Sequence, residues 1–280
     1  MTFFQALMNH AFLQNAVLAG LLASLACGIV GTYVVVRRMS FISGGIAHAV
    51  LGGMGVAYFA GGRPMLGAII AALLFALAVG WISLQAKQQE DTLIGALWAV
   101  GMAVGILFIY KTPGYAVDLL SYLFGNILMV SRADIVIVIA LDLVILATVL
   151  LFYKGFMAVC FDEEFARVQG IHVKTLYIGL LCLIALTIVI LVQIVGIVLV
   201  IALLTLPAAI AGQWAQGLRQ MMGAACFCGL LFVLGGLMVA YPFDLPAGAA
   251  IVLCAGLGFI LSTIIRNLPV RDWGRMWSRR

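Results

Sequence analysis

"FISGGIAHAVLGGMGVAYF", residues 41–59, is a stretch of apolar residues and glycines with one histidine, His48, near its middle. The stretch contains no Lys, Arg, Asp or Glu. It is close to the ~20 apolar residues that a helix needs to cross the hydrocarbon core of a bilayer. Because an ionisable side chain at that depth is costly, it is a functional candidate by default. The stretch therefore predicts a membrane-spanning helix that carries a functional histidine.

Glycines surround this histidine at helical spacing. Gly44, His48 and Gly52 follow one another at four-residue intervals and share one face of the helix. Small residues at this spacing allow neighbouring helix backbones to approach closely. We therefore expect His48 to face protein or a water-filled path rather than lipid. Helix packing is predicted at four glycines, Gly44, Gly45, Gly52 and Gly53.

The whole chain has the composition of a membrane protein. Of its 280 residues, 66% are hydrophobic and 9% are charged, whereas soluble domains carry about 25% charged residues. The strands of a membrane barrel would alternate polar and apolar residues, and these long apolar windows do not. The sequence thus predicts an all-α fold, a polytopic transmembrane helical bundle.

Hydropathy divides the chain into about nine spans and one half-helix. An interfacial helix is expected over 1–13, because this segment lacks the basic region and cleavage site of a signal peptide. The piece 117–130 has about 14 residues, too few to cross at 1.5 Å each, and is predicted to be re-entrant. The transmembrane domain, 14–266, has predicted spans at 14–36, 43–60, 65–86, 93–110, 134–153, 175–194, 196–212, 220–240 and 247–266.

The basic residues set the orientation, because cytoplasmic loops are enriched in Lys and Arg. With an external N-terminus and a non-crossing 117–130, three of the fifteen basic residues lie outside and the other twelve lie inside. The three outside are Arg63, Lys111 and Arg132. We therefore predict a multi-pass protein of the bacterial or archaeal cytoplasmic (inner) membrane. Its basic cytoplasmic tail, 267–280, would lie against anionic membrane lipids.

Few other polar side chains lie near membrane depth. Asp142 lies inside a predicted span, and Asp118 and Asp244 lie toward the predicted outer side. One imidazole with one or two carboxylates is a suitable transient ligand set for Zn²⁺ or Mn²⁺, and a transport site must bind weakly enough to release its ion. His48, Asp118, Asp142 and Asp244 are therefore candidate ligands of a transported ion, not of a permanently bound cofactor. The six cysteines form no C-x-x-C pair and are interpreted as buried structural residues.

The loop 155–174 is the most polar internal segment. Its acidic residues stand at the start of a short helix, where they complement the helix dipole, and Gly170 would end that helix. Its apolar residues recur at intervals of four and three, which is typical of an amphipathic helix. Such a helix suggests a docking surface for a cytoplasmic partner. The acidic residues are Asp162, Glu163 and Glu164, and the apolar ones are Phe161, Phe165 and Val168.

Five blocks of the chain resemble the membrane permease subunits of the ABC importers for zinc, manganese and related divalent metals. They are "VVVRRMSFISGGIAHAVLGG", "DLLSYLFGNIL", "FDEEFARVQGI", "VGIVLVIALLTLPAAIA" and "YPFDLPAGAAIVL". The first matches a turn and helix in which members typically carry arginine, methionine, serine and then a "SHA" or "AHA" histidine. The resemblance covers about residues 10–266. Any one block alone would be weak, but together the blocks are specific.

This resemblance implies the architecture of a type II ABC importer. Two permease copies, a homodimer, would form the pathway. A dimer of cytoplasmic ATPase subunits would bind below it, and an extracytoplasmic metal-binding protein would deliver the ion. The segment Phe161–Gly170, including Ala166, would be the coupling helix that fits a groove in the ATPase, and His48 would contribute to the metal path. The chain has no G-x-x-x-x-G-K-[ST] loop, so it is not expected to be an enzyme itself, and no nucleic-acid partner is expected.

Gly44 departs from the family pattern, because many members carry an aspartate four residues before the histidine. A site that is poorer in oxygen ligands leans toward zinc over manganese. We therefore expect the permease subunit of an ATP-driven zinc importer, and manganese or iron import by the same architecture is the alternative.

Three other classes of protein fit the sequence less well. A gradient-driven secondary transporter would carry more membrane-embedded carboxylates than Asp142 alone. An intramembrane enzyme would need a dense motif such as H-E-x-x-H or a placed Ser/His pair, and Ser43 lies roughly 140° from His48 around the helix. Permeases for siderophores or vitamin B12 are usually longer and match the five blocks less well.

Overall fold

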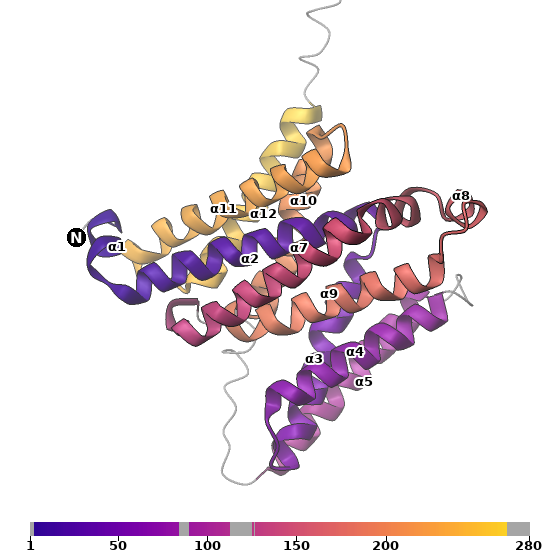
Figure 1. Ribbon diagram of the computed structural model, residues 1–280. Coiled ribbons are helices and arrows are strands. Elements are labelled where there is room, and N and C mark those ends of the chain that lie inside the picture. Colours follow the sequence, from indigo (N-terminus) through magenta and orange to yellow (C-terminus); the bar gives the residue numbers. More distant parts are fainter. Residues whose placement is uncertain (1–2, 84–89, 113–124, 126, 268–280) are drawn as a thin grey trace, which may run out of the picture.

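The computed structural model describes residues 3–83, 90–112, 125 and 127–267. Within these residues it contains helices and no strand, and nine helices are long and apolar enough to cross a membrane (Figure 1). The prediction of an all-α bundle with nine spans is confirmed. The elements are α1 (Phe3–Asn9), α2 (Ala11–Val36), α3 (Ser40–Phe59), α4 (Pro64–Ser83), α5 (Glu90–Lys111), η1 (Ile127–Met129), α7 (Arg132–Phe161), α8 (Glu163–Val168), α9 (Val173–Val195), α10 (Ile197–Trp214), α11 (Leu218–Phe243) and α12 (Ala247–Asn267).

The largest difference from the predicted boundaries lies at the end of α7. The sequence predicts an end at residue 153, but the helix continues to Phe161. Lys154 is charged and breaks the apolar run, whereas Phe156 and Val159 beyond it are buried. Packing of these side chains therefore continues the helix past its apolar stretch, and the predicted loop 155–174 begins inside α7.

The ends of the chain also differ from the prediction. The helix expected over 1–13 is shorter, because α1 ends at Asn9 and His10 has an extended backbone before α2 begins. Most of the predicted half-helix 117–130 lies outside the described residues, and its described end is a single 3-10 turn, η1. The tail beyond residue 267 also lies outside the described residues.

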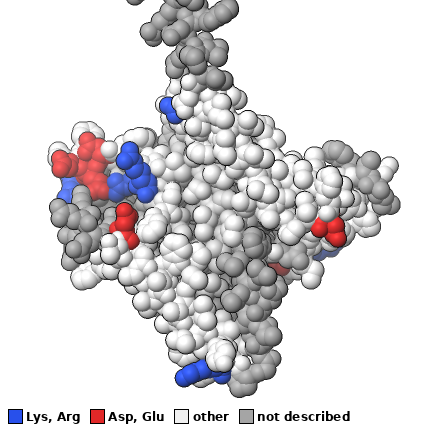
Figure 2. Space-filling view, turned by 180° about the vertical axis from the view of Figure 1, so that it is seen from behind, with Lys and Arg blue, Asp and Glu red and all other residues white. Residues whose placement is uncertain are grey.

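Two groups of helices make up the bundle. The central helix, α2, packs on α7, α9, α10 and α11. The second group is a layer of α3, α4 and α5, which joins the rest mainly through α4 on α9 (Figure 1). In the apolar stretch of α5 only 11% of the residues are buried, against 72% in α2, so α5 packs on α3 with one side and leaves its other side uncovered within the described chain. Charged side chains occupy a few places at the margins of the face shown in Figure 2, and its broad middle is uncharged, as a lipid-embedded band requires.

Glycines bring α4 and α5 close to α3. A Cβ added to Gly52 would lie 2.6 Å from the carbonyl oxygen of Gly101 on α5. A Cβ added to Gly53 would overlap the carbonyl oxygen of Gly67 on α4. Each contact therefore needs the absence of a side chain, which is how small residues allow helices to approach within membranes.

The other two glycines of this face differ from one another. A Cβ on Gly45 would lie 2.8 Å from Ile94 and 2.9 Å from Phe75, so Gly45 also packs closely. A Cβ on Gly44 would meet no heavy atom within 4 Å. The prediction that Gly44 packs against a neighbouring helix therefore needs correction, because that side of α3 is open in the described chain.

Candidate functional site

His48 lies in the middle of α3 and meets Trp98 of α5. The two rings are stacked, with centroids 4.4 Å apart and planes 12° apart. His48 is half-buried, and its Nδ1 is buried without a hydrogen-bond partner among the described residues. In a neutral imidazole protonated at Nε2, Nδ1 carries a free lone pair that can bind a metal. This nitrogen is thus a candidate ligand without a competing partner among the described residues.

Trp98 holds the histidine ring in position, and sequence reasoning missed it. Its indole Nε1 donates to the sulfur of Met102 at 3.1 Å, and its ring centroid lies 6.0 Å from that of Phe41. The stack therefore has support from both α3 and α5. No local signal identifies Trp98, because the pairing of α3 with α5 is a tertiary contact.

Open space lies one helical turn before His48. Gly44 is half-buried, and nothing fills the position that its Cβ would occupy. Residues four apart on a helix lie on the same face, so this space adjoins the imidazole. An ion with its water molecules needs such room.

The other predicted ligands do not join His48 in the described chain. Asp142 is buried on α7, and neither of its carboxylate oxygens has a hydrogen-bond partner among the described residues. Asp244 is exposed at the end of α11, and Asp118 lies outside the described residues. Within those residues, no three or more His, Cys, Asp and Glu side chains group closely enough to hold a metal ion. The predicted set is scattered because α7 packs on α2 and α9, whereas His48 meets α5.

The predicted coupling segment, Phe161–Gly170, begins at the last residue of α7 and contains the short helix α8. Asp162 ends α7 and caps α8, and its carboxylate accepts a hydrogen bond from the backbone N–H of Phe165 at 2.9 Å. Ala166 is fully buried and fixes one side of α8 against the bundle. Gly170 has φ +77°, a conformation that favours glycine. Local capping and this turn together fix the direction of α8.

The opposite side of α8 is apolar and exposed. Phe161, Phe165 and Val168 are 67%, 58% and 87% exposed, respectively. Apolar side chains that gather on an otherwise polar surface mark interaction sites. The amphipathic pattern of the sequence thus corresponds to an uncovered apolar face.

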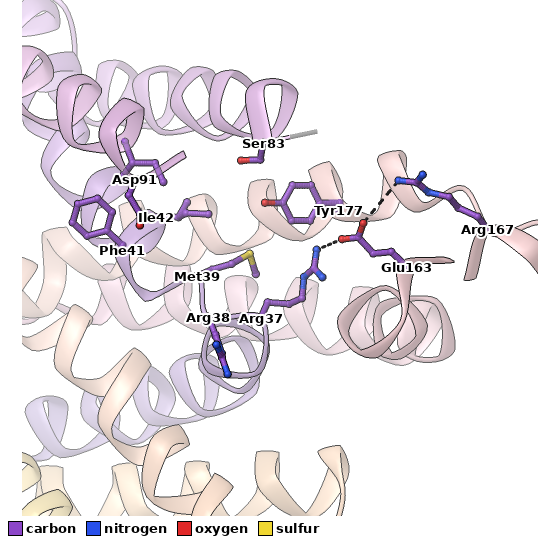
Figure 3. Close-up of a pocket in the computed structure, with 11 residues that line it drawn as sticks. Arg37, Arg38, Met39, Phe41, Ile42, Ser83, Asp91, Glu163, Arg167 and Tyr177 are labelled. Atoms are coloured by element: carbon purple, nitrogen blue, oxygen red, sulfur yellow. Dashed lines mark hydrogen bonds and ion pairs between the residues drawn. The ribbon is translucent and has the colours of Figure 1, made fainter. Parts of the chain in front are cut away.

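A second feature missed from the sequence ties α8 to the turn between α2 and α3. Arg37 in that turn donates a hydrogen bond to Glu163 and lies over the ring of Tyr177, 5.3 Å from its centroid (Figure 3). Arg167 approaches the other carboxylate oxygen of Glu163 at 3.9 Å. These four side chains line a cavity of about 360 Å³ beneath α8. The tie is sheltered, because 21% of each side chain of the Arg37–Glu163 pair is exposed.

Residues 9–266 match the ABC 3 transport family. The chain belongs to this family. It is 45% identical to an uncharacterized membrane protein of Synechocystis, over 93% of this chain and 92% of that protein. It is 36% identical to the manganese transport system membrane protein MntC of Halalkalibacterium halodurans, over 93% of this chain and 89% of that protein.

A solved structure has the same fold. The chain matches a chain of PsaBC from Streptococcus pneumoniae, solved in complex with Fab, with a TM-score of 0.83 and 33% identity. The match covers 93% of this chain and 94% of that chain. The resemblance to ABC permeases found in the sequence is confirmed, and the protein is a multi-pass protein of the cytoplasmic membrane.

In this ABC permease, α3 connects the two candidate regions. The helix begins at Ser40, three residues after Arg37, and His48 follows eight residues later. At 1.5 Å per residue, about 12 Å of helix separates His48 from the first residue of α3. A displacement of α8 can therefore be transmitted to His48 through the Arg37–Glu163 ion pair and helix α3.

Proposed function

We propose that this chain is the membrane permease of an ATP-driven importer of divalent metal ions, and that zinc is the transported ion. The observation that carries the proposal is the unpartnered Nδ1 of His48, beside the open space at Gly44. Imidazole suits zinc, whereas carboxylate and water ligands suit manganese. No carboxylate stands one turn before His48, so the local chemistry favours zinc.

The proposed site is completed by a second copy of the permease. Zinc takes four ligands, and the described chain offers one imidazole at this position. In a two-fold dimer the same surface of each subunit meets its counterpart. If the open side of α3 at Gly44 lies at the dimer axis, two His48 side chains approach one ion and water fills the remaining positions. A small and partly aqueous ligand set suits an ion that must leave again.

Partner subunits supply the energy and the ion in this proposal. The exposed apolar face of the coupling segment docks into a groove of a cytoplasmic ATPase subunit. The complex contains two of these ATPase subunits, one for each permease copy. An extracytoplasmic metal-binding protein docks on the opposite side, where Asp244 is exposed. ATP-driven movement of the ATPase subunits shifts α8, and the tie through Arg37 passes this shift to α3.

Manganese is the second candidate, because the relative from Halalkalibacterium halodurans is named as a manganese transport protein. The two candidates make different demands on the site. A manganese permease would need oxygen ligands near His48 that come from outside the described residues, and Asp118 is the carboxylate to test first.

The experiment is metal uptake into vesicles that contain the permease together with its ATPase and binding protein. Wild type is compared with His48→Ala, with zinc and manganese in competition. His172→Ala is the matched control, because His172 is an exposed residue at the start of α9. We expect His48→Ala to abolish zinc uptake with the complex still assembled, and His172→Ala to transport normally. Unchanged uptake in His48→Ala would make His48 a packing residue, and preferential manganese uptake by wild type would overturn the choice of zinc.

A further inference from the structure

A groove runs along the layer formed by α3, α4 and α5. Both α4 and α5 pack extensively on α3 but touch one another little, so a gap stays open between them above α3. This α3–α4–α5 groove has a volume of about 710 Å³. Ligand pockets typically have volumes of roughly 300–1,000 Å³, so the groove is large enough for part of an organic molecule.

The lining of the groove is almost entirely apolar. Its floor contains Gly52 and Gly53 of α3, and its walls contain Ile70 of α4 and Val100 of α5. Ile70 and Val100 are 58% and 61% exposed, so these walls have no protein partner in the described chain. The only charged residue among the described residues that line the groove is Arg63.

Arg63 stands at one end of the groove. It lies in the turn before α4, on the side predicted to face outward, and is exposed without an ion-pair partner among the described residues. On α4 the lining extends from this turn to Ala78. That is about 22 Å of helix at 1.5 Å per residue, which reaches far into a hydrocarbon core about 30 Å thick. The groove is thus an apolar channel along the membrane with a cation at its mouth.

We propose that the α3–α4–α5 groove binds an anionic phospholipid of the outer leaflet, with one acyl chain in the groove and the phosphate group at Arg63. The apolar length of the groove matches a hydrocarbon chain, and the charge at its mouth matches a phosphate. Basic pockets between membrane helices recognise lipid headgroups by this combination.

A second copy of the permease fits the groove less well than a lipid. In a two-fold interface the groove would face its own counterpart. Because its described lining has no acidic residue, each Arg63 would be covered without an opposite charge, and an unpaired buried charge is strongly unfavourable. A lipid brings both the apolar chain and the missing negative charge.

The bound lipid has a structural role toward the metal path. It fills the gap between α4 and α5 and supports α5 on the side that has few protein contacts. Since α5 carries Trp98, which stacks on His48, the lipid helps to keep that stack in place. This inference rests on the groove alone and stands whatever ion the permease transports.

The test is lipid binding to the purified full-length chain, delipidated in detergent and titrated with dioleoyl phosphatidylglycerol or dioleoyl phosphatidylcholine, with bound lipid counted by native mass spectrometry. We expect wild type to prefer phosphatidylglycerol. Arg63→Gln should weaken that binding about fivefold, the effect of one cation near an anionic surface, and weaken phosphatidylcholine binding less, because the choline cation offsets the charge of its phosphate. Lys111→Gln is the matched control, because Lys111 is an exposed basic residue at the same predicted outer side but not in the groove.

A second variant tests the acyl-chain site. Val100→Trp fills the groove from its exposed wall and should reduce binding of both lipids, with the thermal unfolding midpoint unchanged in the absence of lipid. Equal losses in Arg63→Gln and Lys111→Gln would show general surface attraction and overturn the site. Unchanged lipid binding in Val100→Trp would also overturn the lipid site. A change of oligomeric state in Val100→Trp without a loss of lipid binding would show that the groove is an interface between copies of the chain.

Discussion

The side chains of Arg37 and Glu163 form an ion pair between positions 126 residues apart in the chain. Arg37 lies in the turn that leads into α3, and Glu163 lies in the first turn of α8. The pair therefore joins α8, with its exposed apolar face, to the helix that carries His48. Because the pair is sheltered, removing one partner leaves the other charge partly buried and costs more than at an ordinary surface salt bridge, which is worth about 0–1 kcal/mol.

Reversing the charge at this pair should uncouple ATP hydrolysis from transport. In Arg37→Glu two carboxylates face one another, and we expect a several-fold loss of uptake while ATP hydrolysis continues. The double variant Arg37→Glu with Glu163→Arg restores opposite charges and should recover part of the uptake. The measurement is the number of ions imported per ATP hydrolysed. Arg167→Gln is the control, because Arg167 is 57% exposed and its guanidinium lies as far as 3.9 Å from the same carboxylate, so its contact is weak. An equally large loss of uptake in Arg167→Gln would contradict a special role for Arg37.

Gly44→Asp should shift the ion preference toward manganese. The new side chain meets no atom within 4 Å at its Cβ, so it fits, and it places a carboxylate one turn before the imidazole of His48. Oxygen ligands suit manganese better than imidazole alone. We expect the ratio of manganese to zinc uptake to rise, measured with both ions in competition. Gly44→Asn has the same shape without the charge and should stay close to wild type. A ratio that is the same in both variants would mean that the ion does not pass this point.

The close contact of α3 with α4 should make Gly53 intolerant of any side chain. Gly53→Ala places a methyl group against the backbone of Gly67, and overpacking of this kind costs about 1–3 kcal/mol. Gly44→Ala is the matched control on the same helix, where the added methyl group meets open space and helix propensity favours alanine by up to about 1 kcal/mol. Thermal unfolding in detergent should give a lower midpoint for Gly53→Ala and an unchanged or higher one for Gly44→Ala. Equal midpoints would contradict the packing.

Asp142→Asn should leave transport intact. The substitution keeps the size of a buried side chain and removes a carboxylate whose oxygens have no hydrogen-bond partner in the described chain. An unpaired charge in an apolar interior is unfavourable, so we expect equal or greater stability in thermal unfolding and normal metal uptake. Loss of uptake with a stable fold would instead place Asp142 on the ion path.

The span pattern could be predicted from the sequence because hydropathy acts locally. Helices that face lipid and helices that face the core are both strongly apolar, so each appears as a window with few or no charges whatever it contacts. The extension of α7 beyond Lys154 could not be predicted, because it depends on Phe156 and Val159 packing against other helices. Helix ends outside the apolar window are set by tertiary contacts.

The candidate site could be predicted only one element at a time. Spacing placed His48 and Gly44 on one face of a helix, and it placed the apolar residues of α8 on another. It could not show that Trp98 covers the imidazole or that Arg37 reaches Glu163, because each pair comes from helices far apart in the chain. The same limit explains the wrong prediction for Gly44. Its sequence context matches that of Gly52, but only Gly52 packs against a neighbouring helix in the described chain.

The length of α7 has a mechanical consequence. Its 30 residues make a rod of about 45 Å, some 15 Å longer than the hydrocarbon core is thick, and only Asp162 separates the rod from α8. Because a bilayer is about 40–45 Å thick with its headgroup regions included, the overhang carries α8 to the membrane surface, and α7 can serve as a lever arm whose far end lies at Arg132, on the opposite side of the membrane. Replacing two residues of the overhang by glycine would make the helix more flexible there, so that less of a displacement of α8 reaches the rest of α7, while the helical register and both ends stay in place.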